Sequence, residues 1–277
     1  MLELTLPNEQ QISSSFYYAT TSPITDYAII LGGYVPTTIH GKEFSYKQLK
    51  TRPGIYWTKT VNKHNHVIPR NNISILDQYG NIEWASNDNQ TIGIRPVTSY
   101  KQIIATQQKK ETDHHINYFH FPQSAAPLNI QLQLEYLYYN PDLYTSILKT
   151  NNTFHSPTIR NNQLYVITYD EYEYEQKRYI RVKPLIQKPV ILSNGNTYTN
   201  KDIVWIEVEP LTWYVDQNKE IAITNNIIIP SLFDQNDCMK PFNQTDIKNF
   251  MDEYLSKNLE QTIPHEKIYK KIKNNKE

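Results

Sequence analysis

Nine segments of this 277-residue chain are strand-like, and helix-like segments are few. The strand-like segments alternate apolar and polar residues or carry dense β-branched runs, which is typical of β-strands. They cover residues 55–60, 72–76, 81–84, 93–97, 164–169, 178–183, 202–209, 211–215 and 220–229. Turns at 78–81 and 193–196 contain glycine and asparagine, which accept left-handed backbone conformations. We therefore predict an α+β fold with a mixed, largely antiparallel sheet and a few short helices.

The few helical signals predict short helices. Residues 24–31 follow Ser22–Pro23 and stop at Gly32–Gly33, and residues 127–148 predict one or two amphipathic helices with a break at Asn140–Pro141. The clearest helix begins at Thr245, with apolar residues on one face and charged residues on the other. These are Ile247, Phe250, Met251, Tyr254 and Leu255 on the apolar face, and Asp252, Glu253 and Lys257 opposite. A last short helix is expected at 265–272.

Charge and composition exclude several classes of function. The 28 basic and 28 acidic residues balance to a net charge of zero, which gives no electrostatic reason to expect a nucleic-acid or membrane partner. The seven scattered glycines form neither a P-loop nor a dinucleotide-binding motif, so we expect no cofactor. We find neither a signal peptide nor a transmembrane segment, which predicts a cytoplasmic or virion-associated protein.

A set of short motifs resembles a known type of module. Residues 116–124, which include Phe119-His120-Phe121-Pro122-Gln123, are similar to an opening "GxYPQ" strand, although Phe-His-Phe replaces Gly-x-Tyr. Residues 204–216 resemble a core hairpin, 221–228 a following strand, and 245–251 a helix of the same modules. They belong to an uncharacterised bacterial family related to C-type-lectin-like and sulfatase-modifying-factor (formylglycine-generating-enzyme-like) domains. The usual closing motif, "YW-T/R-S … G … G-x-R-P", is found early in this chain as Tyr56-Trp57-Thr58, Gly80 and Gly93-Ile94-Arg95-Pro96.

This motif order suggests a circularly permuted C-type-lectin-like module spanning 1–260. Its closing part would be 1–101, a polar linker 102–115 and its opening part 116–260, followed by a basic helix or tail at 261–277. Two separate domains, or exchange of the N-terminal part between copies, are the alternatives. Contacts of Trp57 or Arg95 with the region from Trp205 to Trp213 would distinguish these arrangements.

Candidate catalytic and metal-binding groups are isolated in the sequence. Sulfatase-modifying oxidases, whose fold the resemblance implies, use cysteine pairs, whereas Cys238 is the single cysteine here. His64 and His66 have a spacing that zinc could use, with Asp77 or Glu83 as further ligands. We favour solvated histidines at both positions, because paired histidines in an asparagine-rich loop usually bind no metal. We therefore predict neither catalytic residues nor a metal site.

Three aromatic or charged features are interpreted as structural. Alternation in residues 169–175 places Tyr172 and Tyr174 on one face of an exposed edge hairpin that closes near Gln176–Lys177. Glu171, Glu173 and Glu175 are expected on its other face. Trp205 and Trp213, on either side of Pro210, are expected in the core of a strand pair, and Arg95 is expected to anchor carbonyls or a carboxylate inside the fold.

Residues 62–89 form the candidate binding surface. They lie just ahead of the closing G-x-R motif, where the variable stretch lies in C-type-lectin-like proteins with diversified binding surfaces. Aromatic and amide side chains make adaptable contacts, although an AT-rich genome would also place asparagine in every surface loop. The candidate ligand-binding residues are Asn62, His64, His66, Asn72, Asp77, Tyr79, Asn81, Trp84, Asn87 and Asp88.

These observations rank three functions. The first is a non-catalytic recognition protein that binds a protein or glycan ligand through residues 62–89. The second is a structural or assembly protein of a virion or mobile element, which would form a homo-oligomer. The third is an enzyme of unknown reaction on a formylglycine-generating-enzyme-like fold.

Overall fold

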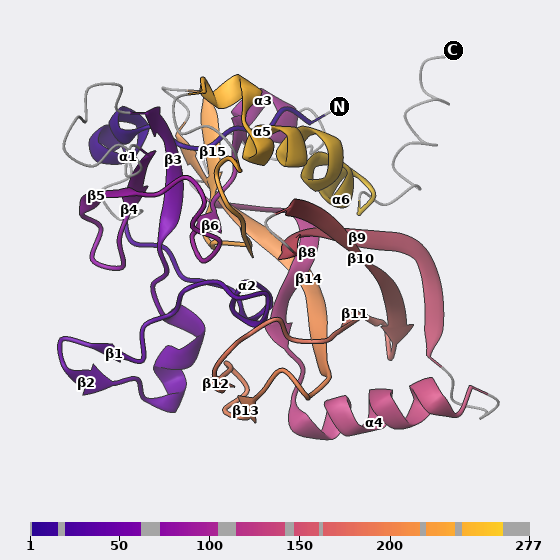
Figure 1. The fold of residues 1–277 in the computed structure, drawn as a ribbon. Coiled ribbons are helices and arrows are strands. Elements are labelled where there is room, and N and C mark those ends of the chain that lie inside the picture. The colour runs from indigo at the N-terminus through magenta and orange to yellow at the C-terminus, as the bar shows by residue number, and fades with distance from the viewer. Residues whose placement is uncertain are drawn as a thin grey trace, which may run out of the picture.

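The computed structural model describes residues 2–15, 20–61, 73–104, 115–141, 147–160, 163–216, 220–235 and 240–262. Its described part is α+β, with largely antiparallel sheets and a few short helices, which confirms the predicted fold class (Figure 1). The stretch 62–72, most of the expected linker, Cys238 and the expected helix at 265–272 lie outside the described residues. The resemblance to C-type-lectin-like modules stays a prediction.

The larger sheet contains seven strands. Their order is β7-β15-β14-β11-β10-β9, with β8 pairing β14 as well. The bounds are β7 (Val97–Ser99), β8 (His115–Ala125), β9 (Leu148–Arg160), β10 (Gln163–Tyr174), β11 (Lys177–Val182), β14 (Val204–Asp216) and β15 (Ile221–Thr224). β14 is the central strand: β8 pairs along one of its edges, and β11 and β15 pair along different parts of its other edge. Every pairing in this sheet is antiparallel.

The second sheet contains five strands in the order β16-β6-β3-β4-β5. These are β3 (Tyr56–Val61), β4 (Ile73–Leu76), β5 (Ile82–Ala85), β6 (Gly93–Ile94) and β16 (Ile229–Pro230). Only the β3–β6 pair is parallel. Two small hairpins complete the strands, β1 (Thr38–Ile39) with β2 (Lys42–Glu43), and β12 (Val190–Ile191) with β13 (Thr197–Tyr198).

Short helices cover the sheets. They are α1 (Glu9–Ser15), α2 (Asp26–Ile30), α3 (Tyr100–Ile104), α4 (Leu128–Tyr139), α5 (Asp246–Phe250) and α6 (Ser256–Glu260), with 3-10 turns η2 (Tyr46–Thr51) and η3 (Phe242–Gln244). A π-helical turn, η4 (Met251–Leu255), joins α5 to α6. In Figure 1, α4 lies at the lower end of the large sheet, and α5 and α6 lie at its upper end.

The sequence signals identify α2, α4 and the helix after Thr245, but α2 begins at Asp26 rather than at residue 24, and α1 and α3 were not predicted, α3 extending into the expected linker. Thr25 caps α2, its side chain accepting from the N–H of Ala28, and the chain leaves the helix through Gly32, whose φ is +100°. Thr245 caps α5 in the same way. The predicted apolar face of this last helix is confirmed, because Ile247 and Leu255 are buried while Glu253 is exposed. α4 ends before Asn140, as predicted; residues 142–146 of the predicted second helical part lie outside the described residues, and β9 begins at Leu148.

Early and late parts of the chain share both sheets. β7 pairs with β15 and β6 pairs with β16. The chain therefore changes sheets twice, once at Arg95–Pro96 and once at residues 225–228, and the two crossings lie side by side. Arg95 is fully buried between them, and its Nε donates to the carbonyl of Thr224 at 2.8 Å. This contact matches the predicted anchoring role of Arg95.

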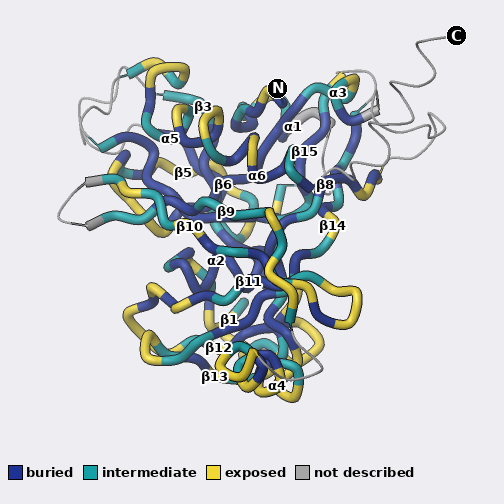
Figure 2. The backbone as a smooth tube through the Cα atoms, turned by 90° about the vertical axis from the view of Figure 1, so that its right-hand side faces the viewer, coloured by how far each residue is buried: buried dark blue, intermediate teal, exposed yellow. Residues whose placement is uncertain are grey.

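Trp57 forms a further contact between the early and late chain. Its Nε1 donates to the carbonyl of Ser231 at 2.7 Å, and its ring lies 5.4 Å from that of Phe233. Trp57 and Trp213 belong to one continuous hydrophobic core, which runs through the middle of the molecule along α2, β8 and β14 (Figure 2). Circular permutation relative to C-type-lectin-like modules stays a prediction.

The predicted core hairpin at 204–216 is wrong. Residues 204–216 form a single strand that continues through Pro210, where the pairing with β8 becomes irregular. Proline cannot donate a ladder hydrogen bond, and this irregularity accommodates it. Trp205 and Trp213 are both buried, as predicted, but Trp205 packs in a separate cluster with Leu134 and Leu137 of α4, and Trp213 packs in the main core.

The predicted edge position of the acidic-aromatic hairpin is also wrong. β10 and β11 close through Glu175 and Gln176, near the predicted turn, but β9 and β14 pair with their outer edges. Glu171, expected to face solvent, is completely buried. Its carboxylate accepts from Thr150 Oγ1 at 2.8 Å and Asn152 Nδ2 at 2.9 Å, and Arg178 lies 3.5 Å away. These partners come from β9 and β11, and the polar sequence of β9 gave no strand signal.

Candidate functional site

The turn between β4 and β5 holds the first group of described candidate residues. Asp77 Oδ1 accepts hydrogen bonds from the backbone N–H groups of Tyr79 and Asn81, both at 2.8 Å. The Asn81 side chain donates to the other carboxylate oxygen at 3.2 Å. Gly80 occupies the left-handed region, with a φ of +84°, which closes the turn. The side chain of Asp77 thus fixes the backbone that carries Tyr79.

Exposed apolar side chains gather beside this turn. Tyr79 is 46% exposed, Ile82 is 47% exposed and Trp84 is 36% exposed. Ile82 and Trp84 lie on β5, the edge strand of the five-stranded sheet, and the Tyr79 ring lies 5.6 Å from the His40 ring. We call Asp77, Tyr79, Asn81, Ile82, Trp84 and Asp88 the β5 surface.

The other candidate residues have different positions. Asp88 is exposed, and its carboxylate accepts from the Ser86 hydroxyl. Asn87 is buried, and its amide donates to the carbonyl of Asp234 at 2.7 Å, which ties the loop to the C-terminal part. The remaining four candidates lie outside the described residues. They are Asn62, His64, His66 and Asn72.

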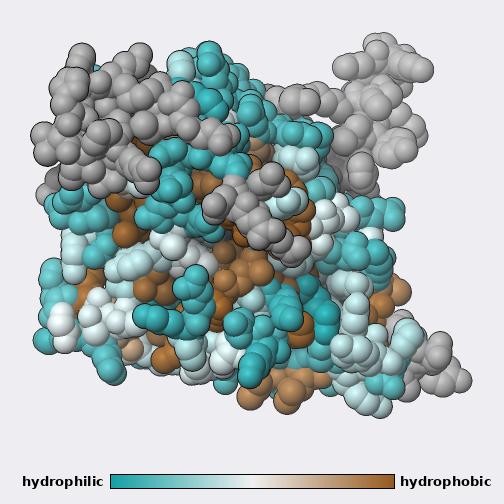
Figure 3. All heavy atoms as spheres, in the orientation of Figure 1, coloured by the Kyte–Doolittle hydropathy of each residue, from teal (hydrophilic) through white to brown (hydrophobic). Residues whose placement is uncertain are grey.

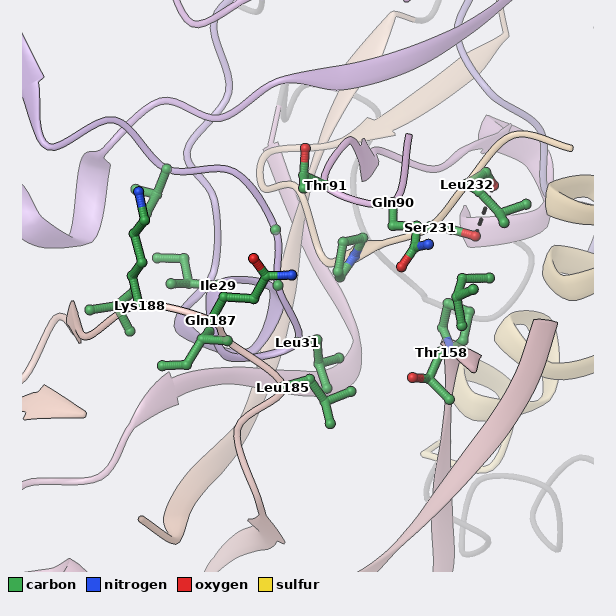
Figure 4. A pocket seen from close by; sticks show the side chains of 18 of the residues that line it. Ile29, Leu31, Gln90, Thr91, Thr158, Leu185, Gln187, Lys188, Ser231 and Leu232 are labelled. Atoms are coloured by element: carbon green, nitrogen blue, oxygen red, sulfur yellow. Dashed lines mark hydrogen bonds between the residues drawn. The ribbon is translucent and has the colours of Figure 1, made fainter. Parts of the chain in front are cut away.

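A cleft of about 620 Å³ lies next to the end of α2. Gly32–Gly33 and the β9–β10 tip contribute to it, together with the loops at 90–91, 185–190 and 230–232. Lys188 lies at one end of the cleft and Ser231 and Gln90 at the other, with Leu31 and Leu185 between them (Figure 4). Backbone hydrogen bonds hold the walls: Leu185 N–H donates to the Ile30 carbonyl at 2.7 Å, and Tyr34 N–H to the Thr91 carbonyl at 2.8 Å.

The cleft lining is divided about equally between polar and apolar surface. Isoleucine, leucine, valine and proline are the commonest lining residues, and Lys188 is its one ionisable residue among those described. Acid–base catalysis needs a positioned pair of titratable groups. This cleft can therefore bind a ligand, but its described residues do not supply such a pair.

The described histidines have structural surroundings. His115 packs edge-on against the ring of Tyr214 at 4.5 Å. Burial, with a smaller contribution from the positive charge of Arg178, lowers the pKa of His120 to about 4, so its imidazole is neutral at neutral pH. No three described histidine, cysteine, aspartate or glutamate residues cluster as metal ligands. The proposed zinc ligands His64 and His66 lie outside the described part.

Comparison of the chain with protein-family models, with curated proteins and with solved structures finds no match. Among the helices of the described part, none has the length and hydrophobicity required to cross a membrane.

The cleft was not anticipated from the sequence. Its walls come from five segments that are far apart in the chain, and none carries a recognisable ligand-binding motif. The one local signal is the sequence Lys183-Pro-Leu-Ile-Gln-Lys-Pro189, in which two prolines bracket a loop. The β5 surface was anticipated as part of residues 62–89.

Proposed function

We propose that this chain is a non-catalytic recognition protein that binds a protein or a glycan through the β5 surface. The observation that carries the proposal is the pair of exposed aromatic side chains, Tyr79 and Trp84, beside a turn fixed by Asp77. Aromatic rings offer a large contact area and lose little conformational entropy on binding. A rigid turn lowers the ordering cost further, because its backbone already has one conformation.

Polar groups around the aromatic pair support the same proposal. Asn81 and Asp88 are exposed next to Tyr79 and Trp84 on the turn and on the loop after β5. A glycan places its apolar face on an aromatic ring and directs its hydroxyl groups to amides and carboxylates. A protein partner would use the aromatic side chains as central anchors surrounded by a polar rim.

Binding to arrays of defined glycans and of peptides tests this function. We expect the chain to bind a subset of either array, and Trp84→Ala and Tyr79→Ala to weaken that binding by about 30-fold, the effect typical of an interface anchor. Tyr46→Ala is the matched control, because Tyr46 is 67% exposed and lies outside the β5 surface. Equal binding by all three variants, or the absence of bound glycans and peptides, would contradict the proposal.

A second candidate function is self-assembly, favoured by the outer face of α4. Four large apolar side chains on this helix are strongly exposed, and Figure 3 shows hydrophobic residues at the lower edge of the molecule, where α4 lies. They are Leu128, Leu132, Tyr136 and Tyr139, with exposures of 51%, 65%, 59% and 67%. The inner face of α4 buries Leu134 and Leu137 beside Gln131, so apolar side chains lie on the inner and the outer side of the helix. An apolar stripe on a helix is normally packed against another part of the protein or a partner.

A second copy of the chain is the occupant that fits this face. Antiparallel packing of two α4 helices about a twofold axis places Leu132 opposite Tyr136 of the other copy, so the stripe is self-complementary. Glu135 is the only charged residue on the helix, and Arg181 pairs with it at 2.6 Å. Two copies that meet through this face therefore bring no unpaired charge into their interface.

Leu132→Glu is expected to abolish this association. The substitution places a carboxylate at the centre of the stripe, and its burial against a second copy would be unfavourable. Sedimentation equilibrium should show a wild-type dimer at micromolar concentration and a monomeric variant. Ile82→Glu provides a control, because Ile82 is 47% exposed on the other sheet. If the wild-type protein is still monomeric at about 100 μM, its dimer affinity is weaker than the micromolar affinity of a stable dimer. That result would exclude this function.

A further inference from the structure

The cleft beside α2 has the dimensions and lining of a small-molecule site. Its volume of about 620 Å³ lies within the range of roughly 300 to 1,000 Å³ that such sites occupy. The apolar part of the lining comes from different layers of the fold. Ile29 and Leu31 lie at the end of α2, Ile159 and Leu164 at the β9–β10 tip, and Leu185 in the loop after β11.

The polar groups of the cleft are separated along its length. Lys188 and the neighbouring Gln187 are toward one end, whereas Gln90, Thr91 and Ser231 are grouped at the other, as Figure 4 shows. Lys188 is exposed, and no described carboxylate forms an ion pair with it. Ser231 Oγ donates to the Leu232 carbonyl at 3.0 Å, which leaves the oxygen of its hydroxyl as an acceptor. One end of the cleft therefore favours an anion, and the middle favours a hydrocarbon.

The cleft is largely preformed. The N–H of Gly33 donates to the Ala28 carbonyl at 2.9 Å, and a Cβ at position 33 would lie 2.7 Å from that same oxygen. Glycine is therefore required for the tight exit from α2 that opens one wall. On the opposite wall, the N–H of Ser231 donates to the Ile92 carbonyl at 3.0 Å. A ligand that enters this space does not have to order the walls first.

We propose that this cleft is a second binding site, distinct from the β5 surface, for an amphipathic carboxylate with a single hydrocarbon chain. The carboxylate pairs with the Lys188 ammonium group, and the chain lies over Leu31 and Leu185 toward Ser231. An uncharged amphiphile gains only the apolar contacts, and a cationic one is repelled by Lys188. Lys188 is the one charged residue among the described lining residues, so its end of the cleft favours an anion over a cation.

Isothermal titration calorimetry with octanoate, decanoate and dodecanoate tests the proposal. Because each buried methylene adds to the apolar driving force, we expect binding to tighten by about fourfold per added methylene while the chain remains within the cleft. Decan-1-ol should bind about tenfold more weakly than decanoate, and decyltrimethylammonium more weakly still, because neither forms a charge-assisted contact with Lys188.

Three variants separate the charge contact from the apolar contacts. Lys188→Gln should weaken decanoate about tenfold and leave decan-1-ol unchanged, whereas Lys183→Gln, an exposed lysine outside the lining, should change neither. Leu185→Trp should block decanoate, decan-1-ol and decyltrimethylammonium alike, because it adds volume in the middle of the cleft. Leu185 is 37% exposed, so we expect the unfolding temperature of this variant to stay close to that of the wild type.

Two results would overturn the proposal. One is the absence of saturable decanoate binding at millimolar concentration. The other is equal affinity for decanoate, decan-1-ol and the cation with no effect of Lys188→Gln, which would indicate non-specific adsorption. Trp84→Ala should leave decanoate binding unchanged, so that failure at this cleft is distinguishable from failure at the β5 surface.

Discussion

Arg95→Met should lower the free energy of unfolding by about 3 kcal/mol, because two buried hydrogen bonds from a charged donor are lost. Arg95 Nε donates to the carbonyl of Thr224 at 2.8 Å, and Arg95 Nη1 donates to the hydroxyl of Tyr56 at 3.1 Å. The guanidinium also lies 5.2 Å from the centre of the Tyr56 ring. The arginine therefore links the five-stranded sheet to β15 of the seven-stranded sheet, at the position where the chain changes sheets.

Urea unfolding followed by tryptophan fluorescence and by circular dichroism measures this effect. Arg95→Lys should lose most of the same stability, because an ammonium group cannot direct two N–H groups as the planar guanidinium does. Lys101→Met serves as the control: its side chain is 73% exposed in a 2.6 Å ion pair with Glu220, and exposed pairs contribute well under about 1 kcal/mol. A loss below about 1 kcal/mol for Arg95→Met would show that this buried arginine does not join the two sheets energetically.

Asn258→Ala should cost about 2 to 3 kcal/mol and expose the outer edge of β9. The Asn258 side chain is completely buried on α6. Its Oδ1 accepts from the N–H of His155 at 3.0 Å, and its Nδ2 donates to the carbonyl of the same residue at 2.8 Å. Gln261 bonds to both backbone groups of Thr153 in the same way. Two side-chain amides thus replace the neighbouring strand that an edge strand lacks, which protects β9 from pairing with other chains.

Hydrogen exchange at the His155 amide reports this contact directly. Asn258→Ala should accelerate exchange at His155 more than at residues in β14, and it should promote aggregation at high protein concentration. Asn258→Asp should also be destabilising, because one carboxylate oxygen then faces the His155 carbonyl. Lys257→Ala, an exposed change on the same helix, should alter stability by less than about 0.5 kcal/mol. Unchanged His155 exchange in Asn258→Ala would contradict this role.

Most elements whose secondary-structure signal lies within one short stretch of sequence were predicted. The helix after Thr245 was predictable, because its cap and its apolar stripe are both contained in about twelve residues. The turn at 77–81 was predictable for the same reason, since Asp77 and Gly80 fix it locally. β9 was missed because its polar residues, such as Asn152, are partners of Glu171 across the sheet rather than an alternating apolar set.

The two candidate sites differ in the same respect, because one was visible in the sequence and the other was not. The β5 surface belongs to one continuous stretch, so its amide and aromatic composition was visible in the sequence. The cleft was invisible, because residues such as Leu31, Thr91, Leu185 and Ser231 become neighbours only after both sheets form. The burial of Asn87 likewise depends on Asp234, which is far away in the sequence.

The sequence by itself determined the α+β class, the end of α4 at Asn140, the cap of the helix after Thr245 and the anchoring role of Arg95, because these depend on short-range backbone preferences and on residue chemistry. Only the tertiary structure decided that 204–216 is one strand, that Glu171 is buried and that a cleft opens beside α2. Each of these depends on contacts between distant segments. The free energies of such contacts are set by tertiary packing and not by local propensity.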